Sequence, residues 1–235
     1  MANGSEGPDP PDAVSLTPLG RGANPNARQP LLSLQPPTLP FMLKLLFLDR
    51  LTDATRLTDA CKVDLLQRLR VGALDEDAVY ARRPAGRPSL LLVTSGIARV
   101  FIDTHDGRDV TQHFLRAEDF VVADLADERG VVERVEAITE LGFVSIDYAE
   151  LEALALKHPC LIEFLAAFYT ARDLRERERA ARFRQSGAVE TYASFLLTHP
   201  GLETQVPTIH LASYLGLTTS QFMRARQKYR QRGIM

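Results

Sequence analysis

The sequence is poor in the residues that build metal centres. Its two cysteines, Cys61 and Cys160, are far apart in the chain and have no further cysteine at metal-ligand spacing. They cannot by themselves hold an iron–sulfur cluster or a four-ligand zinc site, and they suit a reducing compartment. His158 lies beside Cys160, but a helix start explains that pair better than a metal site. His113 is read as a structural strand residue. We expect no metal and no cofactor.

Long apolar runs are also absent. No stretch approaches the roughly 20 apolar residues that a membrane-spanning helix needs. The N-terminus shows no basic region followed by an apolar core, which a secretory signal would require. The sequence therefore predicts a cytoplasmic protein without a membrane partner.

Motifs for common enzyme chemistry are missing as well. The sequence has no glycine-rich phosphate loop, nucleophile elbow or zinc-protease motif. Asp103, Asp106 and Asp109 surround Gly107, but they lack the spacing and the final glutamate of a calcium loop. They indicate a hairpin turn instead. We expect that the protein is not an enzyme.

Acidic residues stop at Glu203. The cations that follow it are Arg224, Arg226, Lys228, Arg230 and Arg232. The formal net charge of the whole chain is only -2, so positive charge is concentrated at one end. This asymmetry favours a polyanionic partner over the alternative of a solvated helix end that complements its own dipole.

The same end of the chain carries a helix-turn-helix pattern. A short helix around Leu211 and Leu215 leads into Gly216, where a tight turn requires a positive φ. Thr218 and Gln221 then form a Thr-x-x-Gln capping box at the start of a second helix. The side chains expected to be buried on that helix are Phe222, Ala225, Tyr229 and the stem of Arg226. Its polar and basic residues therefore face outward, as in a DNA-binding helix-turn-helix.

The chain divides into four parts by composition. Residues 1–39 are rich in Pro, Gly, Asn and Ser and predict a disordered extension. Residues 40–158 begin with two short helices and continue as short strands, which is typical of a sandwich or barrel-like roll. Residues 159–185 predict one long helix, and residues 186–235 hold the helix-turn-helix domain. The predicted fold class is α+β, with an N-terminal antiparallel β-roll, a long helix and a C-terminal helix-turn-helix.

The expected elements of the roll follow from apolar patterning and turn residues. The expected strands cover residues 89–96, 97–102, 110–115, 120–122, 131–137 and 141–146. The expected helices before them cover residues 41–51 and 57–69. A further helix over residues 148–157 is expected to start at a capping box of Asp147 and Glu150.

The long helix is apolar in its first half and alternates charge in its second half. The apolar stripe consists of Leu161, Phe164, Leu165, Phe168 and Leu174. A helix of this kind often pairs with a copy of itself. Packing against its own domain explains the pattern equally well.

This order of elements resembles the CRP/FNR family of bacterial dimeric transcription regulators, which have a cyclic-nucleotide-binding-like β-roll. The resemblance covers roughly residues 42–231, and the segment from Thr191 to Thr218 looks like the Bacteroidetes-type subgroup. It implies a homodimer along the long helix, with double-stranded DNA and RNA polymerase as partners. The two recognition helices would enter successive major grooves about 34 Å apart.

The recognition helix matches the family only in part. Relatives that read a G-rich half-site have arginine and glutamate just after the cap, where this chain has Thr219 and Ser220. The arginine one turn later matches Arg224, whose fork can bond bidentately to guanine. Lys228 and Arg230 are expected to contact phosphates. The predicted DNA-binding residues are Thr218, Thr219, Ser220, Gln221, Arg224, Gln227, Lys228 and Arg230.

The resemblance also places the family's cyclic-nucleotide ligands. The glutamate and arginine positions fall on Ala123 and Val131. Arg134 should point to the opposite face of its strand, and Arg129 is expected to be a solvated loop residue. Because a buried phosphate needs a charged partner, we expect that cyclic AMP does not bind in the family's usual mode. The candidate effector pocket consists of Phe120, Ala123, Val131 and Val132, with no effector assigned.

Two functions from different classes are therefore compared. The first is a sequence-specific DNA-binding transcription regulator that acts as a homodimer. The alternative is a signalling module that does not bind DNA and whose β-roll binds a small ligand or a protein partner. Duplex binding and its salt dependence distinguish the two.

Overall fold

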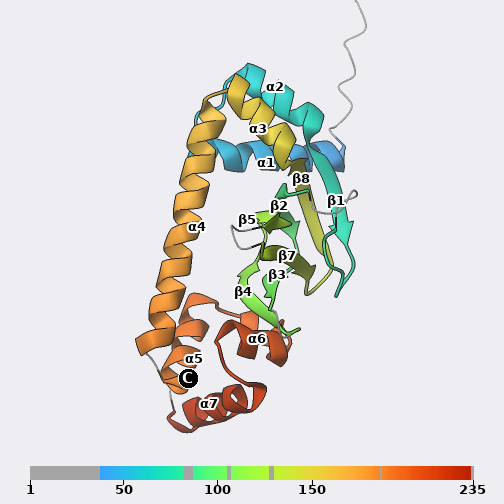
Figure 1. Ribbon diagram of the computed structural model, residues 1–235. Coiled ribbons are helices and arrows are strands. Elements are labelled where there is room, and N and C mark those ends of the chain that lie inside the picture. The colour runs from blue at the N-terminus through green and yellow to red at the C-terminus, as the bar shows by residue number, and fades with distance from the viewer. Residues whose placement is uncertain (1–37, 82–86, 105–106, 127–129, 186, 234–235) are drawn as a thin grey trace, which may run out of the picture. The chain divides into compact units, whose positions relative to one another are not determined.

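The computed structural model describes residues 38–81, 87–104, 107–126, 130–185 and 187–233 (Figure 1). Residues 1–37 of the predicted extension, together with Asp106, Arg129 and Ser186, lie outside these ranges. Within them, no helix combines the length and apolarity needed to cross a bilayer.

Helices open and close the described chain, with the strands between them. The helices are α1 (Leu39–Ala54), α2 (Asp59–Arg68), α3 (Tyr148–Lys157), α4 (Cys160–Gln185), α5 (Ala188–Thr198), α6 (Thr208–Tyr214) and α7 (Thr219–Gln231), with a 3-10 turn η1 (Leu202–Thr204). Every helix expected from the sequence is present, which confirms the helical half of the predicted α+β fold.

The strands form two antiparallel four-stranded sheets. They are β1 (Arg70–Leu74), β2 (Ser89–Ser95), β3 (Ala98–Asp103), β4 (Asp109–Leu115), β5 (Phe120–Ala123), β6 (Leu125–Ala126), β7 (Val132–Ala137) and β8 (Leu141–Asp147). The strand orders are β1-β8-β2-β5 in one sheet and β4-β3-β7-β6 in the other. The predicted antiparallel roll is therefore confirmed.

Two strands were not expected from the sequence, and the first changes a predicted cap. β1 has few strand-forming residues but pairs with β8 from Arg70↔Ser145 to Leu74↔Leu141. This pairing brings Arg70 within 3.3 Å of Glu150 Oε1, and Glu150 Oε2 accepts no hydrogen bond. The predicted capping box of Asp147 and Glu150 is therefore wrong. Asp147 caps α3 alone, where its Oδ1 accepts the N–H of Ala149 at 2.9 Å. The second unexpected strand, β6, has only two residues.

The sheet that contains β2 is buried on both faces. Leu91 and Val93 belong to the cluster between the two sheets, whereas Leu90 and Leu92 belong to the cluster beneath α1, α2, α3 and the start of α4. A strand covered on both sides needs apolar residues at every position, which explains the unbroken run from Leu90 to Val93.

The first half of α4 packs on the roll of its own chain. Leu161 and Phe164 are fully buried in the cluster under the helices, and Leu165 and Phe168 are half-buried against it. The ring of Phe164 meets Phe120 edge-on, with centroids 5.3 Å apart. Leu174 is exposed. Most of the apolar stripe thus completes the chain's own core.

The helix-turn-helix core includes side chains from the roll. Ile97, Phe114 and Ile138 join the buried cluster formed by α5, α6 and α7. Alongside them, the backbone N–H of Thr111 on β4 donates to the Ser213 hydroxyl on α6 at 3.0 Å. The packing of the C-terminal helices therefore depends on the outer face of the second sheet.

A buried arginine stiffens that outer face. Arg99 on β3 is 2% exposed and pairs with Glu136 on β7 and with Asp109 on β4, the latter at 2.6 Å. The hydrogen bond from Arg99 holds the pKa of Asp109 below its ordinary value. Two carboxylates and one guanidinium thus clamp three neighbouring strands together where α6 rests on them.

Candidate nucleic-acid interface

The turn between α6 and α7 has the predicted local geometry. Gly216 has a φ of +66°, a conformation that favours glycine. The N–H of Gln221 donates to Thr218 Oγ1 at 3.2 Å, and the N–H of Thr218 donates to Gln221 Oε1 at 2.9 Å. This reciprocal capping box was predicted and is confirmed.

The buried side of α7 fixes which side faces outward. Phe222 and Ala225 are buried, and the rings of Phe222 and Tyr229 each pack edge-on against Tyr192 of α5. The opposite side follows the i, i+4, i+7, i+11 spacing of one helix face. That outward face consists of Ser220, Arg224, Gln227 and Gln231, all exposed.

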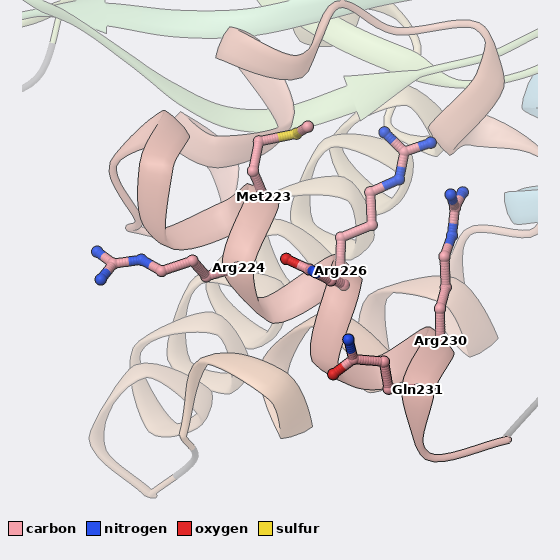
Figure 2. Close-up of a pocket in the computed structure, with 6 residues that line it drawn as sticks. Met223, Arg224, Arg226, Arg230 and Gln231 are labelled. Atoms are coloured by element: carbon pink, nitrogen blue, oxygen red, sulfur yellow. The ribbon is translucent and has the colours of Figure 1, made fainter.

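The basic residues of α7 divide into two groups. Figure 2 shows Arg224 pointing away from Arg226 and Arg230, all three of which line a surface hollow of about 560 Å³ on this helix. Arg226 Nε lies 2.8 Å from Glu203 Oε1 and Arg230 Nη2 lies 4.0 Å from the same oxygen. The Nε of Arg226 lacks the alignment of a hydrogen bond, so this contact is an ion pair.

Glu203 is the centre of this ion-pair group. It lies on η1 with its side chain 16% exposed, and it accepts the hydroxyl proton of Tyr192 at 2.6 Å. Burial, followed by this hydrogen bond, raises the pKa of Tyr192 above its ordinary value. Glu203 thus neutralises part of the basic charge behind α7 and ties the helix to α5.

Arg224 and Lys228 form the second group of basic residues. In the described part of the chain, neither lies within ion-pair distance of a carboxylate. Arg224 donates from Nε to the backbone oxygen of Ser220 at 3.3 Å, which leaves its terminal fork available. Arg232, by contrast, pairs with Glu190 at 3.2 Å. The two positive charges of α7 without a carboxylate partner in the described chain, Arg224 and Lys228, therefore lie about one helical turn apart on the outward side.

The predicted DNA-binding residues all lie on α7 or at its cap and are exposed. The structure adds two distinctions. The side chains of Thr218 and Gln221 bond to each other's backbone, so they shape the helix start. Glu203 was not singled out, although its position as the last acidic residue before a wholly basic tail was a usable signal.

The candidate effector residues do not form one cluster. Phe120 packs towards the helices with Phe47 and Phe164, whereas Ala123 is buried between the two sheets. Val131 and Val132 are half-buried at the start of β7. Arg134 pairs with Asp103 at 3.4 Å, with both side chains about half exposed. Arg134 therefore does not supply a positive charge at Ala123.

The described residues contain no group of three or more His, Cys, Asp or Glu side chains placed to hold a metal ion. No protein-family model matches the sequence, and no curated protein matches it either.

Solved structures, in contrast, match over most of the chain. A protein from Eubacterium rectale described as a transcriptional regulator of the Crp/Fnr family has a TM-score of 0.63 at 18% identity, covering 76% of this chain and 86% of its own. FixK2 from Bradyrhizobium japonicum has a TM-score of 0.60 at 21% identity, over 71% and 86%. The c-di-GMP-responsive global regulator CLP from Xanthomonas campestris has a TM-score of 0.60 at 16% identity, over 75% and 94%. The chain therefore has the fold of the CRP/FNR regulators.

Proposed function

We propose that the chain is a sequence-specific, double-stranded-DNA-binding transcription regulator of the cytoplasm and not an enzyme. The observation that carries the proposal is the outward face of α7. There an arginine with a free fork, Arg224, lies beside the exposed amide of Gln227 and the hydroxyl of Ser220. Arginine reads guanine and glutamine reads adenine in the major groove through paired hydrogen bonds.

The division of charge on α7 supports separate roles for its cations. Arg224 lies at the middle of the outward face of α7 and is proposed to read a base. Lys228 carries an uncompensated charge on its flank and is proposed to bind a phosphate. Arg230 is 57% exposed but shares Glu203 with Arg226, so it is proposed to contribute less to phosphate binding than Lys228.

The regulator is proposed to act as a homodimer along α4, with RNA polymerase as a further partner. The buried residues of the stripe are occupied by the roll, so the contact would use the exposed surface of the helix. Ile162 and Leu174, about 120° apart around the helix axis, are each more than half exposed there. A Leu174→Glu variant that stays dimeric in sedimentation velocity, together with an Ile162→Glu variant that does so, would exclude this arrangement.

Cyclic AMP is proposed not to control the protein in the usual mode, since Ala123 is wholly buried among apolar side chains and offers the ribose no acceptor. Arg129, the remaining candidate for the phosphate, lies outside the described residues. Calorimetry on the wild type and on Arg129→Ala tests this point. Micromolar binding that the substitution removes would contradict it.

The deciding experiment selects duplexes from a random library with the full chain and then measures affinities by fluorescence anisotropy. Arg224→Ala should cost about 1–3 kcal/mol at one base position and relax the preference there. Lys228→Ala should weaken all duplexes alike and make the log–log salt slope shallower by about 0.9 per lost phosphate contact, which is about 1.8 for the proposed homodimer. Arg56→Ala removes an equal charge from an exposed residue between α1 and α2 and should change neither quantity.

Two results would reject the proposal. If the chain fails to bind any duplex at low salt, the signalling-module function replaces it. If Arg224→Ala and Lys228→Ala weaken every duplex by the same factor, α7 binds phosphates without reading bases.

A further inference from the structure

A second cavity lies outside the interior of the β-roll. It has a volume of about 320 Å³, and its walls come from β4, the turn between β4 and β5, the second half of α4, the end of α5 and the end of α6. This volume falls at the lower end of the range of about 300–1,000 Å³ that is usual for small-molecule sites. A ligand there would touch the roll, the long helix and the helix-turn-helix at once.

One wall of the cavity is aromatic. The ring of Tyr214 from α6 packs against those of Phe114 on β4 and His199 after α5, with centroid separations of 5.2 and 5.5 Å. Phe195 stacks behind His199 with its ring tilted by only 18°. Such a set of rings, held in place by its neighbours, offers a planar ligand a stacking surface at little cost in side-chain entropy.

The opposite walls carry more positive than negative side chains. Three arginines (Arg116, Arg172 and Arg175) and two acidic residues (Asp119 and Glu176) line the cavity. Arg172 is already engaged, because it pairs with Glu133 at 2.9 Å and with Glu176 at 3.2 Å. Because Arg172 serves two carboxylates, this trio keeps one net negative charge, and the lining charges outside it are those of Arg116, Arg175 and Asp119.

Arg116 and Arg175 are placed to receive an anion. Arg116 uses one terminal nitrogen to donate to the backbone oxygen of Pro200 at 3.0 Å, which fixes its side chain and leaves further N–H donors. Arg175 is exposed on α4 and has no carboxylate within ion-pair distance among the described residues. Asp119 accepts the backbone N–H of Arg116 at 2.8 Å, and burial raises the pKa of its carboxyl despite both arginines. The negative charge of Asp119 opposes an incoming anion, and Arg116 and Arg175 offset it.

We propose that this cavity binds a small anion that carries a planar ring, with the ring against Tyr214 and the anionic group between Arg116 and Arg175. The shared chemistry covers nucleoside monophosphates and aryl carboxylates. Binding itself does not depend on DNA recognition. Its regulatory meaning rests on the proposed function: a ligand that joins Arg175 of α4 to Tyr214 of α6 stabilises one placement of the helix-turn-helix.

The test uses calorimetry on the full chain with 5′-AMP and salicylate as probes and adenosine as the uncharged control. We expect at least one anionic probe to bind at millimolar or lower concentration and adenosine to bind more weakly. Arg116→Gln and Arg175→Gln should each weaken the anion about tenfold. Arg177→Gln, which removes an exposed charge on the same helix outside the cavity, should leave the affinity unchanged. Binding of only one probe assigns the ligand class.

Three outcomes would overturn the proposal. These are no binding of either anion at millimolar concentration, equal binding of adenosine and 5′-AMP, and an affinity that Arg175→Gln and Arg177→Gln lower alike. Duplex affinity measured on the same variants separates this inference from the function above. If a probe binds as expected and no duplex does, the site stands and the DNA-binding function fails. If duplexes bind and the probes do not, the reverse holds.

Discussion

Glu203→Gln should move stability and DNA affinity in opposite directions. The substitution keeps a side chain of the same size, and its amide oxygen can still accept the Tyr192 hydroxyl that now lies 2.6 Å from Glu203. What disappears is the negative charge that Arg226 meets at 2.8 Å and Arg230 at 4.0 Å. Arg226 and Arg230 then lose their carboxylate partner and become available to bind phosphates.

The size of the effect follows from burial. Two unit charges about 4 Å apart near a protein surface attract by roughly 4 kcal/mol at an effective dielectric of 20. The Arg226 side chain is 29% exposed and that of Glu203 is 16% exposed, so desolvation and screening offset much of this attraction. Arg230, at 57% exposure, adds little. We expect a loss of about 1–2 kcal/mol in the free energy of unfolding.

Urea unfolding measures the first effect and anisotropy with a non-specific duplex at several salt concentrations measures the second. Each arginine that reaches a phosphate should steepen the log–log salt slope by about 0.9. Tyr192→Phe is the matched control, because it removes the hydrogen bond and leaves the charge, so it should lower stability without changing the slope. An unchanged slope together with unchanged stability in Glu203→Gln would refute this role of Glu203.

Three further predictions concern the scaffold. Thr218→Ala should destabilise α7 by about 1 kcal/mol in thermal unfolding while Thr218→Ser stays near the wild type, since only the hydroxyl caps the helix; equal losses would contradict this. Gly96→Ala should lower the free energy of unfolding by more than about 3 kcal/mol, because Gly96 has φ +85° and an added Cβ would lie 2.2 Å from the backbone oxygen of Glu140. Gly107→Ala is the control: Gly107 has φ +75° but no atom of the described residues near an added Cβ, so the loss should be only about 1–2 kcal/mol. Hydrogen bonds from Lys157 and His158 lower the pKa of Asp64 from 3.8 to about 2, so the stability it contributes is complete above about pH 4 and is lost as the pH falls towards 2; Asp64→Asn should flatten that part of a stability–pH profile, and an unaltered profile would contradict the assignment.

The secondary structure was predictable where local chemistry decides it. Local chemistry favours one conformation in each of three places, and the structure has that conformation. These are the capping box of Thr218 and Gln221, the turn at Gly216 and the strand from Leu90 to Val93. β1 was missed because its residues favour no strand, and only pairing with β8 makes it one. The partner strand lies about 70 residues further along the sequence, so the pairing leaves no pattern in the local sequence.

The position of the candidate site on the outward face of α7 was predictable, but its charge balance was not. Outward positions on α7 follow from helical periodicity, so the exposed residues of this helix could be named from the sequence. Which cations remain free depends on Glu203, whose approach to Arg226 is a tertiary contact. The arginine- and tyrosine-lined cavity was missed for the same reason, since Arg116, Arg175 and Tyr214 are widely separated in the sequence and share no motif.

The three roll side chains in the helix-turn-helix core, Ile97, Phe114 and Ile138, limit how portable the C-terminal segment is. Each contributes about 1.5–3 kcal/mol when fully buried, and an excised fragment beginning at Gly187 would expose the surface that they cover. A chimera that joins these C-terminal helices to another β-roll of this fold would therefore have to retain the residues at these three positions of the roll. The structural unit that includes the proposed DNA-binding helix is therefore larger than the helix-turn-helix itself.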